Sequence, residues 1–378
     1  MERYDTIVVG LGAMGSAAAF HVARRGKRVV GLEQFTLAHD RGSSHGRSRV
    51  TRQAYFENPA YVPLLRRANE LWTQLQRDSG MRLIEITGGL MLGPPDGGVI
   101  KGTLASARTH GLPHEVLEAP DVRRRFPAFS LEEGKIAVLD KAAGVLFPED
   151  CIRAHAAAAT QAGAELRWQE PVVSWKATSD SVEVKTAQAT YVAGNLVLCA
   201  GPWMADLLPG LGVPLTVERN VLYWCRPTSD VALFAPDKFP VFIIEYGPGK
   251  VFYGFPTLGD DGVKVARHHT GISCSPANIR REISQDEIRE ARSILERNLP
   301  TVNGELLSAT TCMYTNTPDG HFIIDRHPRH PNVILASPCS GHGFKFASVI
   351  GEVLGDLACD GQTEHPTAMF SLGRFTQA

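Results

Sequence analysis

The sequence lacks any strong imbalance of charge. Its 378 residues include 39 Lys and Arg against 40 Asp and Glu, which gives a formal charge of -1 at pH 7. A basic patch is the usual footprint of nucleic-acid or anionic-membrane binding, so we expect neither partner. No apolar run approaches the length of a membrane span, and acidic Glu2 and Asp5 argue against a signal peptide. These absences predict a soluble enzyme with no membrane association and no obligate protein partner.

The cysteines and histidines lack the pairing that a disulfide framework or a metal site requires. The seven cysteines are scattered and odd in number, which favours a reducing compartment, and we predict the cytoplasm. The thirteen histidines show no paired metal-ligand spacing. His268 and His269, adjacent on a predicted strand, are expected to point to opposite faces. We therefore predict no metal site.

What the sequence does contain is a nucleotide-binding pattern over residues 5–33. A buried strand at 5–9, an apolar helix at 16–25 and a second strand at 27–32 are predicted. Gly10, Gly12 and Gly15 allow a tight turn and close approach of a pyrophosphate to the helix N-terminus, whose N–H groups bind anions. Glu33, at the end of the second strand, can accept hydrogen bonds from a ribose. This unit predicts an adenine dinucleotide, FAD or NAD rather than NADP.

A chain of this length is expected to form two domains. Buried strands at 196–199 and 333–336 and an apolar C-terminal helix return the chain to the nucleotide-binding sheet. Short strands near 221–225, 241–246, 251–254 and 262–267 predict an antiparallel sheet, followed by a helix that Ser284 and Glu287 begin as a capping box. We predict an α/β Rossmann-like domain over about 1–80, 145–215 and 318–378. An α+β substrate domain with the antiparallel sheet covers about 81–144 and 216–317.

Several motifs, in one order along the chain, resemble the monomeric sarcosine oxidase and N-methyltryptophan oxidase family of FAD-dependent amino acid oxidases. The resemblance spans essentially the whole chain. It implies FAD as cofactor and a glutathione-reductase-like, D-amino-acid-oxidase-like fold for the nucleotide domain. The motifs are G-S-S-H-G-R-S-R-V-T-R-Q-A-Y (42–55), Y-V-P-L (61–64), G-V-L-F (144–147), Y-G-F-P (253–256), C-M-Y-T-N-T-P-D (312–319), H-F-I-I-D (321–325) and S-G-H-G-F-K-F (340–346).

The resemblance also implies roles for individual residues. Cys312 matches the cysteine that forms a thioether with the flavin, whose electronics the protein tunes by nearby charge. Arg52 and Lys345 match the pair that binds the substrate carboxylate. The planar guanidinium of an arginine can donate two parallel hydrogen bonds to a carboxylate, and the ammonium of a lysine adds a compact positive charge. Lys264 matches a lysine over the flavin face, where a positive charge stabilises the negative charge that develops as O2 is reduced.

Further positions follow from the same match. Arg49 and His45 are expected near the flavin ring, and His268, Tyr253 and Ile243 in the substrate cavity. Other expected cofactor contacts are Gly10, Gly12, Met14, Gly15, Glu33, Ser43, Ser44, Val173, Ala200, Gly201, Trp203, Gly341, Gly343, Phe344 and Lys345. Three departures from the family pattern bear on the substrate: Arg47 replaces an acid, Pro338-Cys339 replaces Gly-Phe, and Ile243 replaces a methionine.

The expected reaction is oxidation of a secondary amino acid of the sarcosine type to an imine, with O2 reduced to hydrogen peroxide. Its partners are therefore a small amino acid and O2. One alternative keeps the flavin chemistry and changes the substrate to N-methyltryptophan, pipecolate or a larger N-substituted glycine. A nicotinamide-dependent dehydrogenase and a non-catalytic flavin-binding protein are the remaining alternatives, because a dinucleotide fold does not by itself fix function.

Overall fold

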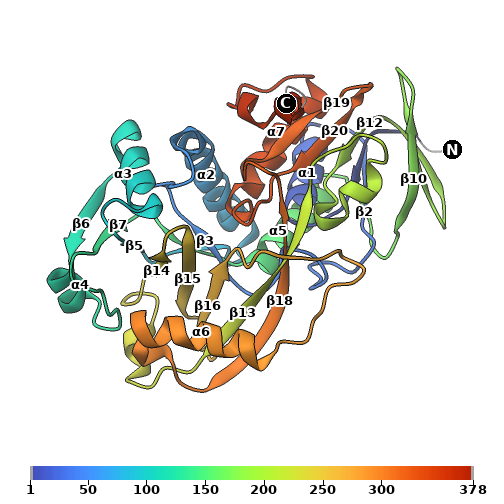
Figure 1. The fold of residues 1–378 in the computed structure, drawn as a ribbon. Coiled ribbons are helices and arrows are strands. Elements are labelled where there is room, and N and C mark those ends of the chain that lie inside the picture. Colours follow the sequence, from blue (N-terminus) through green and yellow to red (C-terminus); the bar gives the residue numbers. More distant parts are fainter. Residues whose placement is uncertain (1–2, 376–378) are drawn as a thin grey trace.

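The computed structural model describes residues 3–375 and contains two large β-sheets (Figure 1). The first has the order β10-β11-β12-β1-β2-β9, with β20 added to the second half of β12 and β19 added to β20. Its strands are β1 (Arg3–Val9), β2 (Val29–Leu32), β9 (Glu165–Arg167), β10 (Val172–Ala177), β11 (Val182–Thr186), β12 (Thr190–Leu198), β19 (Ile323–His327) and β20 (His330–Ser337). Strands β9, β2, β1, β12 and β20 run parallel, as expected for a nucleotide-binding sheet.

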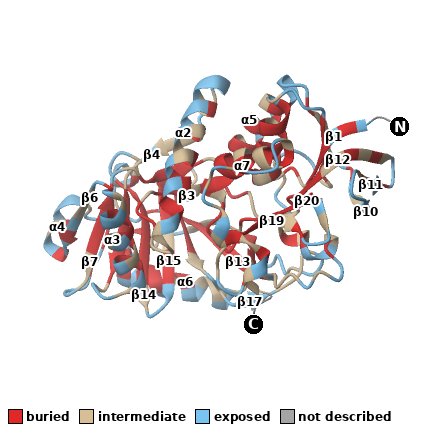
Figure 2. Ribbon diagram, turned by 90° about the horizontal axis from the view of Figure 1, so that it is seen from above, coloured by how far each residue is buried: buried red, intermediate tan, exposed pale blue. Residues whose placement is uncertain are grey.

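Helices cover one face of this sheet and form the largest apolar core with it. They are α1 (Ala13–Ala23), α2 (Val62–Ser79), α5 (Pro148–Gln161) and α7 (Ala347–Cys359). Helix α1 is buried almost all round, and it begins at Ala13, three residues before the predicted start, because Gly12 takes the N-cap position within the turn itself. Figure 2 shows the buried strands and α7 at the centre, with the β10–β11 hairpin projecting to one side.

The second sheet has the order β17-β13-β16-β15-β14-β5-β7-β6, with β18 also paired to β13. Its strands are β5 (Gly89–Gly93), β6 (His114–Glu118), β7 (Ile136–Asp140), β13 (Thr216–Cys225), β14 (Val241–Gly247), β15 (Lys250–Thr257), β16 (Val263–His268), β17 (Ile272–Ser273) and β18 (Leu306–Asn316). The predicted strands are confirmed as an antiparallel group, since β13, β16, β15 and β14 pair antiparallel in that order. Strand β5, which the sequence did not predict, runs parallel to β14.

Helix α6 (Gln285–Asn298) crosses this sheet, and the predicted capping box is confirmed: Ser284 and Glu287 bond each other's backbone N–H. Helices α3 (Gly98–His110) and α4 (Ala119–Arg125) flank the β5–β7 side (Figure 1). A small sheet of β3 (Arg49–Thr51), β8 (Gly144–Leu146) and β4 (Ile84–Ile86) joins the halves. Single 3-10 turns occupy Pro59–Tyr61, Gly201–Trp203, Ala205–Leu207, Val231–Phe234, Pro300–Val302, Phe344–Phe346, Ala368–Phe370 and Leu372–Phe375.

The first sheet thus draws its strands from residues 3–32, 165–198 and 323–337, and the second from 89–140 and 216–316. The predicted domain boundaries stay a prediction. All seven cysteines are free. Within residues 3–375, no helix combines the length and apolar character needed to cross a membrane, and no three His, Cys, Asp or Glu side chains gather as a metal-binding group.

Two buried histidines in the helical layer are expected to make the protein acid-labile. Burial lowers the pKa of His21, with the His155 charge adding to it, and lowers that of His155, in each case to about 3. Unfolded histidine binds a proton below about pH 6.5, whereas these two stay neutral until about pH 3, so the stability they contribute is present above pH 6.5 and is lost as pH falls. At pH 5 each group is expected to have removed roughly 2 kcal/mol of unfolding free energy.

Chemical denaturation at pH 7 and pH 5, with His155→Phe alongside, measures this effect. The ring of His155 lies 5.1 Å from that of Trp72, so phenylalanine retains the aromatic packing while removing the titrating group. The variant is expected to lose less unfolding free energy between the two pH values than the wild type does. Equal losses in the two proteins would contradict the assignment.

Candidate active site

A cavity of about 420 Å³ extends from the N-terminus of α1 to the second sheet. At its nucleotide end, Gly10 has φ +86°, and a Cβ there would lie 2.6 Å from the carbonyl oxygen of Cys199. A Cβ at Gly15 would lie 1.8 Å from the carbonyl oxygen of Gly10, whereas at Gly12 it would meet nothing closer than 4.0 Å. Gly10 and Gly15 therefore permit the tight turn, and Gly12 leaves room for a ligand beside the helix.

The donors and acceptors at this end fit an adenine dinucleotide. Helix α1 has no side-chain cap and no acidic residue in its first turn, so its first N–H groups are available to a phosphate. Glu33 is 4% exposed and lines the cavity, where its carboxylate also accepts the Leu11 N–H at 2.8 Å. Among residues 3–375, the buried Ser43 Oγ and His45 Nε2 have no hydrogen-bond partner. A bound FAD would supply a partner for Ser43, which lines the cavity, whereas His45 does not line it.

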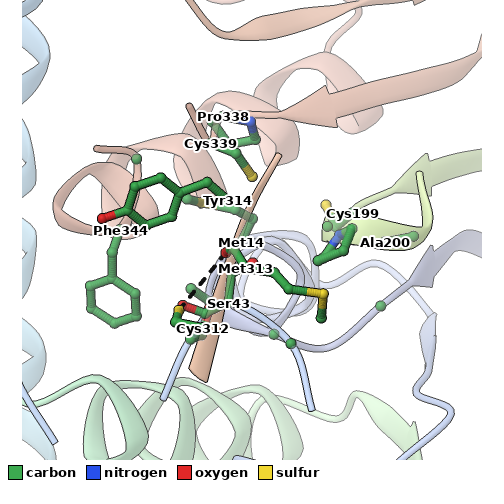
Figure 3. A pocket seen from close by; sticks show the side chains of 18 of the residues that line it. Met14, Ser43, Cys199, Ala200, Cys312, Met313, Tyr314, Pro338, Cys339 and Phe344 are labelled. Carbon is green, nitrogen blue, oxygen red and sulfur yellow. Dashed lines mark hydrogen bonds between the residues drawn. The ribbon is translucent and has the colours of Figure 1, made fainter. Parts of the chain in front are cut away.

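Cys312, from β18, is 2% exposed and lies against the 42–49 loop. Its thiol donates to the Ser43 carbonyl oxygen at 3.7 Å, and Arg49 Nη2 donates to Cys312 Sγ at 3.6 Å and to Ser43 O at 2.7 Å. Figure 3 shows Cys312 and Ser43 together on one wall of the cavity, with Pro338 and Cys339 above them. The loop therefore brings a cation and a thiol to the same point of the cavity.

The predicted carboxylate-binding pair lies in this cavity, with a partner that the sequence analysis missed. Arg52 is 2% exposed, and its Nη2 donates to both carboxylate oxygens of Glu57 at 2.6 Å. Burial opposes ionisation of Glu57, but the charges of Arg52, His342 and Lys345 and the hydrogen bond from Arg52 together outweigh it and hold its pKa at about 2. A substrate carboxylate must therefore share or displace Glu57 at Arg52. No periodicity marks Glu57 in the sequence.

Lys345 is the second cation, and its charge is expected to depend on pH near neutrality. Its Nζ donates to the carbonyl oxygen of His342 at 2.6 Å. Burial, and next the Arg52 charge, lower the pKa of Lys345 to about 7. The group is charged below pH 7 and loses its charge as pH rises through 7, so a carboxylate loses one of two cationic partners in that range.

Affinity for a carboxylate without an amine, such as acetate, is therefore expected to weaken about tenfold per pH unit above pH 7. Titration of the flavin spectrum with acetate between pH 6 and 9 measures this. In a Lys345→Met variant the affinity is expected to be weak and flat with pH. A wild-type affinity that stays constant from pH 6 to 9 would contradict the assignment.

Lys264, on β16, is 2% exposed and does not line the cavity. Its Nζ donates to Gly46 O at 2.6 Å, Ser48 O at 2.8 Å and Ser48 Oγ at 3.1 Å. Burial, and next the Arg49 charge, lower the pKa of Lys264. Two carbonyl oxygens and one hydroxyl oxygen can accept all three N–H donors of the ammonium form. A Cβ at Gly46 would lie 3.6 Å from Lys264 Nζ and 3.7 Å from Arg49 Nη1, so Gly46 packs against both cations.

An aromatic wall from the second sheet completes the cavity. Tyr253 on β15 and Tyr314 on β18 lie with their hydroxyl oxygens 3.3 Å apart. The ring of His268, at the end of β16, lies 5.6 Å from that of Tyr314 and 6.2 Å from that of Tyr253. Burial lowers the pKa of His268, so its ring is neutral at physiological pH. Tyr314 stands in a quoted motif, although the sequence analysis gave it no role.

Most of the residues expected at the site are brought together by the fold. Val173 is not: it is 66% exposed on β10, and its neighbour Val172 lines the cavity, because successive residues of a strand point to opposite faces. Gly15, His45 and Lys264 lie behind the lining. The expected residues that line it are Gly10, Gly12, Met14, Glu33, Ser43, Ser44, Arg49, Arg52, Ala200, Gly201, Trp203, Ile243, Tyr253, His268, Cys312, Gly341, Gly343, Phe344 and Lys345.

The three departures from the family pattern divide between the cavity and the surface. Ile243, Pro338 and Cys339 line the cavity, so they bear directly on the shape of the ligand. Arg47 does not line it; its side chain is 57% exposed and pairs with Asp261. Its guanidinium lies 5.6 Å from the ring centroid of Trp224.

Comparison with known proteins identifies the family. The model of the FAD dependent oxidoreductase family matches residues 5–357. The chain belongs to this family. It is 47% identical to a monomeric sarcosine oxidase of Streptomyces avermitilis, over 99% of this chain and 98% of the relative. An N-methyl-L-tryptophan oxidase of Yersinia pestis is 35% identical over 98% of this chain and 99% of its own length.

Among solved structures, this chain is similar to the open form of NikD, an unusual amino acid oxidase essential for nikkomycin biosynthesis. The two share 27% sequence identity with a TM-score of 0.85, and the match covers 98% of each chain. The predicted combination of a Rossmann-like FAD-binding sheet with a second, largely antiparallel sheet is confirmed.

Proposed function

We propose that this protein is an FAD-dependent oxidase of small N-methyl amino acids, forming an imine and hydrogen peroxide. One observation carries the proposal: two buried cations, Arg52 and Lys345, line the same cavity as the dinucleotide site. Buried cations without a full set of anionic partners favour an anionic ligand. The names of the two curated relatives, a sarcosine oxidase and an N-methyltryptophan oxidase, support an N-methyl amino acid as that ligand.

The residues of the chain position the substrate by its two ends. Arg52 and Lys345 hold the carboxylate, while Tyr253, Tyr314 and the neutral ring of His268 line the space for the amine. The amine must be uncharged to release a hydride from its carbon, and the two cations favour loss of its proton by like-charge repulsion. Bound FAD supplies the hydride acceptor and the route of electrons to O2.

Cys312 is proposed to hold the flavin through a thioether, because its sulfur faces the cavity beside Arg49 and Ser43. Gly10, Gly12, the start of α1 and Glu33 would hold the pyrophosphate and ribose. We further propose that the enzyme acts in the cytoplasm, which the free state of all seven cysteines supports. Its partners are the amino acid and O2.

A panel of amines tests the proposal. Purified protein is mixed anaerobically with sarcosine, N-methyltryptophan, pipecolate and, as a control, acetate, and bleaching of the flavin is followed before air is admitted and peroxide is measured. Sarcosine or another small N-methyl amino acid is expected to bleach the flavin and release peroxide. If N-methyltryptophan or pipecolate reduced the flavin faster than sarcosine did, the proposed substrate would change to a larger amine. A yellow protein that no amine bleaches would overturn the catalytic proposal.

A further inference from the structure

His268 lines the cavity, and one of the two groups that enclose its ring, His269, does not. Strand β16 ends at His268, and the next residue, His269, has φ +61°. This left-handed conformation is unfavourable for a residue other than glycine. It also interrupts the pattern by which successive side chains of a strand point to opposite faces, so the rings of His268 and His269 lie together with centroids 4.2 Å apart. The prediction that they point to opposite faces is therefore wrong.

Glu218 maintains this turn. The carboxylate is 6% exposed and lies on β13 opposite Tyr314, which lines the cavity. It accepts hydrogen bonds from the N–H groups of Thr270 and Gly271, from Asn316 Nδ2 at 2.6 Å and from His269 Nδ1 at 3.0 Å. Burial opposes its ionisation, but these bonds, led by that from His269, hold its pKa at about 2. A buried carboxylate thus ties the turn to the wall of the cavity.

The opposite side of the His268 ring is also closed. Gly341 has φ +75°, and a Cβ there would lie 2.8 Å from His268 Cε1 and 2.6 Å from the ring of Tyr314. His268 is therefore held between Gly341 and the ring of His269. The side chain of His269 is 44% exposed, so that ring connects an enclosed cavity wall with solvent.

We propose that Glu218 and His269 are positioning residues that fix the ring of His268 at the cavity wall and keep it uncharged. A positive charge on the His269 ring would lie beside His268 and oppose a second one there. The other titratable groups that face His268 are Glu57, His342, Lys345, Tyr253 and Tyr314; of these the Glu57 carboxylate alone favours a charged ring, and His342 and Lys345 oppose it.

The consequence for substrate rests on the proposed function. A charged His268 would repel an ammonium group and could not accept a proton from it, whereas a neutral ring can. By keeping His268 neutral, Glu218 and His269 would therefore allow the enzyme to bind amino acids at lower pH. Glu218 and His269 do not line the cavity, so they act through the residues that do, His268 and Tyr314.

Two variants test the proposal in the holoenzyme. His269→Gly removes the ring and suits φ +61°, and Glu218→Gln removes the charge but retains acceptors for Thr270 and Gly271. Titration of ¹⁵N-histidine-labelled protein by NMR gives the pH midpoint of His268 directly. His269→Gly is expected to raise it by about one to three pH units, as loss of a like charge at this distance does. Glu218→Gln, which removes a charge of the opposite sign, is expected to change the midpoint only by releasing the turn that holds the His269 ring, and the double variant is expected to match His269→Gly.

The matched control is His365→Gln, which breaks a histidine–carboxylate pair with Glu352 that has the same 3.0 Å length but does not line the cavity. Anaerobic flavin reduction by sarcosine supplies the second readout. The pH at which sarcosine affinity falls on the acid side is expected to shift with the His268 midpoint, while the limiting rate of flavin reduction is expected to stay the same. An unchanged midpoint in both variants would overturn the inference. If no amine reduces the wild type, the proposed function fails, and the NMR midpoint still decides the role of Glu218 and His269.

Discussion

Replacing Lys264 by methionine is expected to slow the reaction of the reduced enzyme with O2 by a factor of about 10² to 10³, the cost of losing one buried electrostatic stabiliser. Anaerobic reduction by amine is expected to change by no more than a few-fold, because Lys264 does not line the cavity. The ammonium is held by three acceptors of the 42–49 loop, so its charge is fixed in place before negative charge develops on oxygen. Stopped-flow measurement of the two half-reactions separates these effects.

Lys250→Met is the matched control, since Lys250 lies exposed on the neighbouring strand β15. It is expected to leave both half-reactions unchanged. The Lys264 variant removes one donor from each of two buried carbonyl groups, but Gly46 O keeps the Ser48 N–H and Ser48 O keeps Arg49 Nη1, so the expected loss of stability is small. Flavin content and thermal unfolding are measured first to check this. Equal losses in reduction and reoxidation would assign Lys264 to the general structure of the site.

Replacing Cys312 by serine is expected to abolish covalent retention of the flavin. After acid precipitation, the yellow colour should remain with the wild-type polypeptide and pass into the supernatant for Cys312→Ser, because a serine cannot form the thioether. Serine is close in size and can donate to the Ser43 carbonyl oxygen as the thiol does, so the fold should persist. Spectra of pellet and supernatant measure the outcome.

Cys339→Ser controls for loss of any thiol in the cavity, since Cys339 lines the same space. Burial raises the pKa of the Cys339 thiol to about 11, so that sulfur is a poor nucleophile and its variant should keep the colour in the pellet. Colour released from the wild type would contradict the thioether. A colourless wild-type protein would instead favour a nicotinamide cofactor.

The elements that the sequence predicted well depend on neighbours along the chain. The strand–turn–helix unit of residues 5–33 follows from apolar runs broken by glycines, and the cap at Ser284 and Glu287 needs only residues three apart. Most of the expected lining residues likewise came from contiguous motifs, such as the 42–55 loop and 340–346. Local periodicity and motif order are sufficient for such features.

The details that decide the chemistry lie between segments that are distant in sequence. The register of β13 against β18 sets Glu218 opposite Tyr314, and a left-handed His269 turns its ring back onto His268. Enclosure by Gly46 and Ser48, 218 and 216 residues away in sequence, removes Lys264 from the cavity surface. Only the fold places Glu57 on Arg52 inside the same enclosed space as Lys345.

By itself, then, the sequence determined the cofactor class, the two kinds of sheet and the cations Arg49, Arg52 and Lys345 that face the cavity, because these follow from local patterns and from ordered motifs. The tertiary structure alone decided which of those charges are already paired, which are enclosed and which stay neutral. The physical reason is that burial and the approach of a second charge set the state of an ionisable group, and both depend on packing between segments rather than on either segment alone.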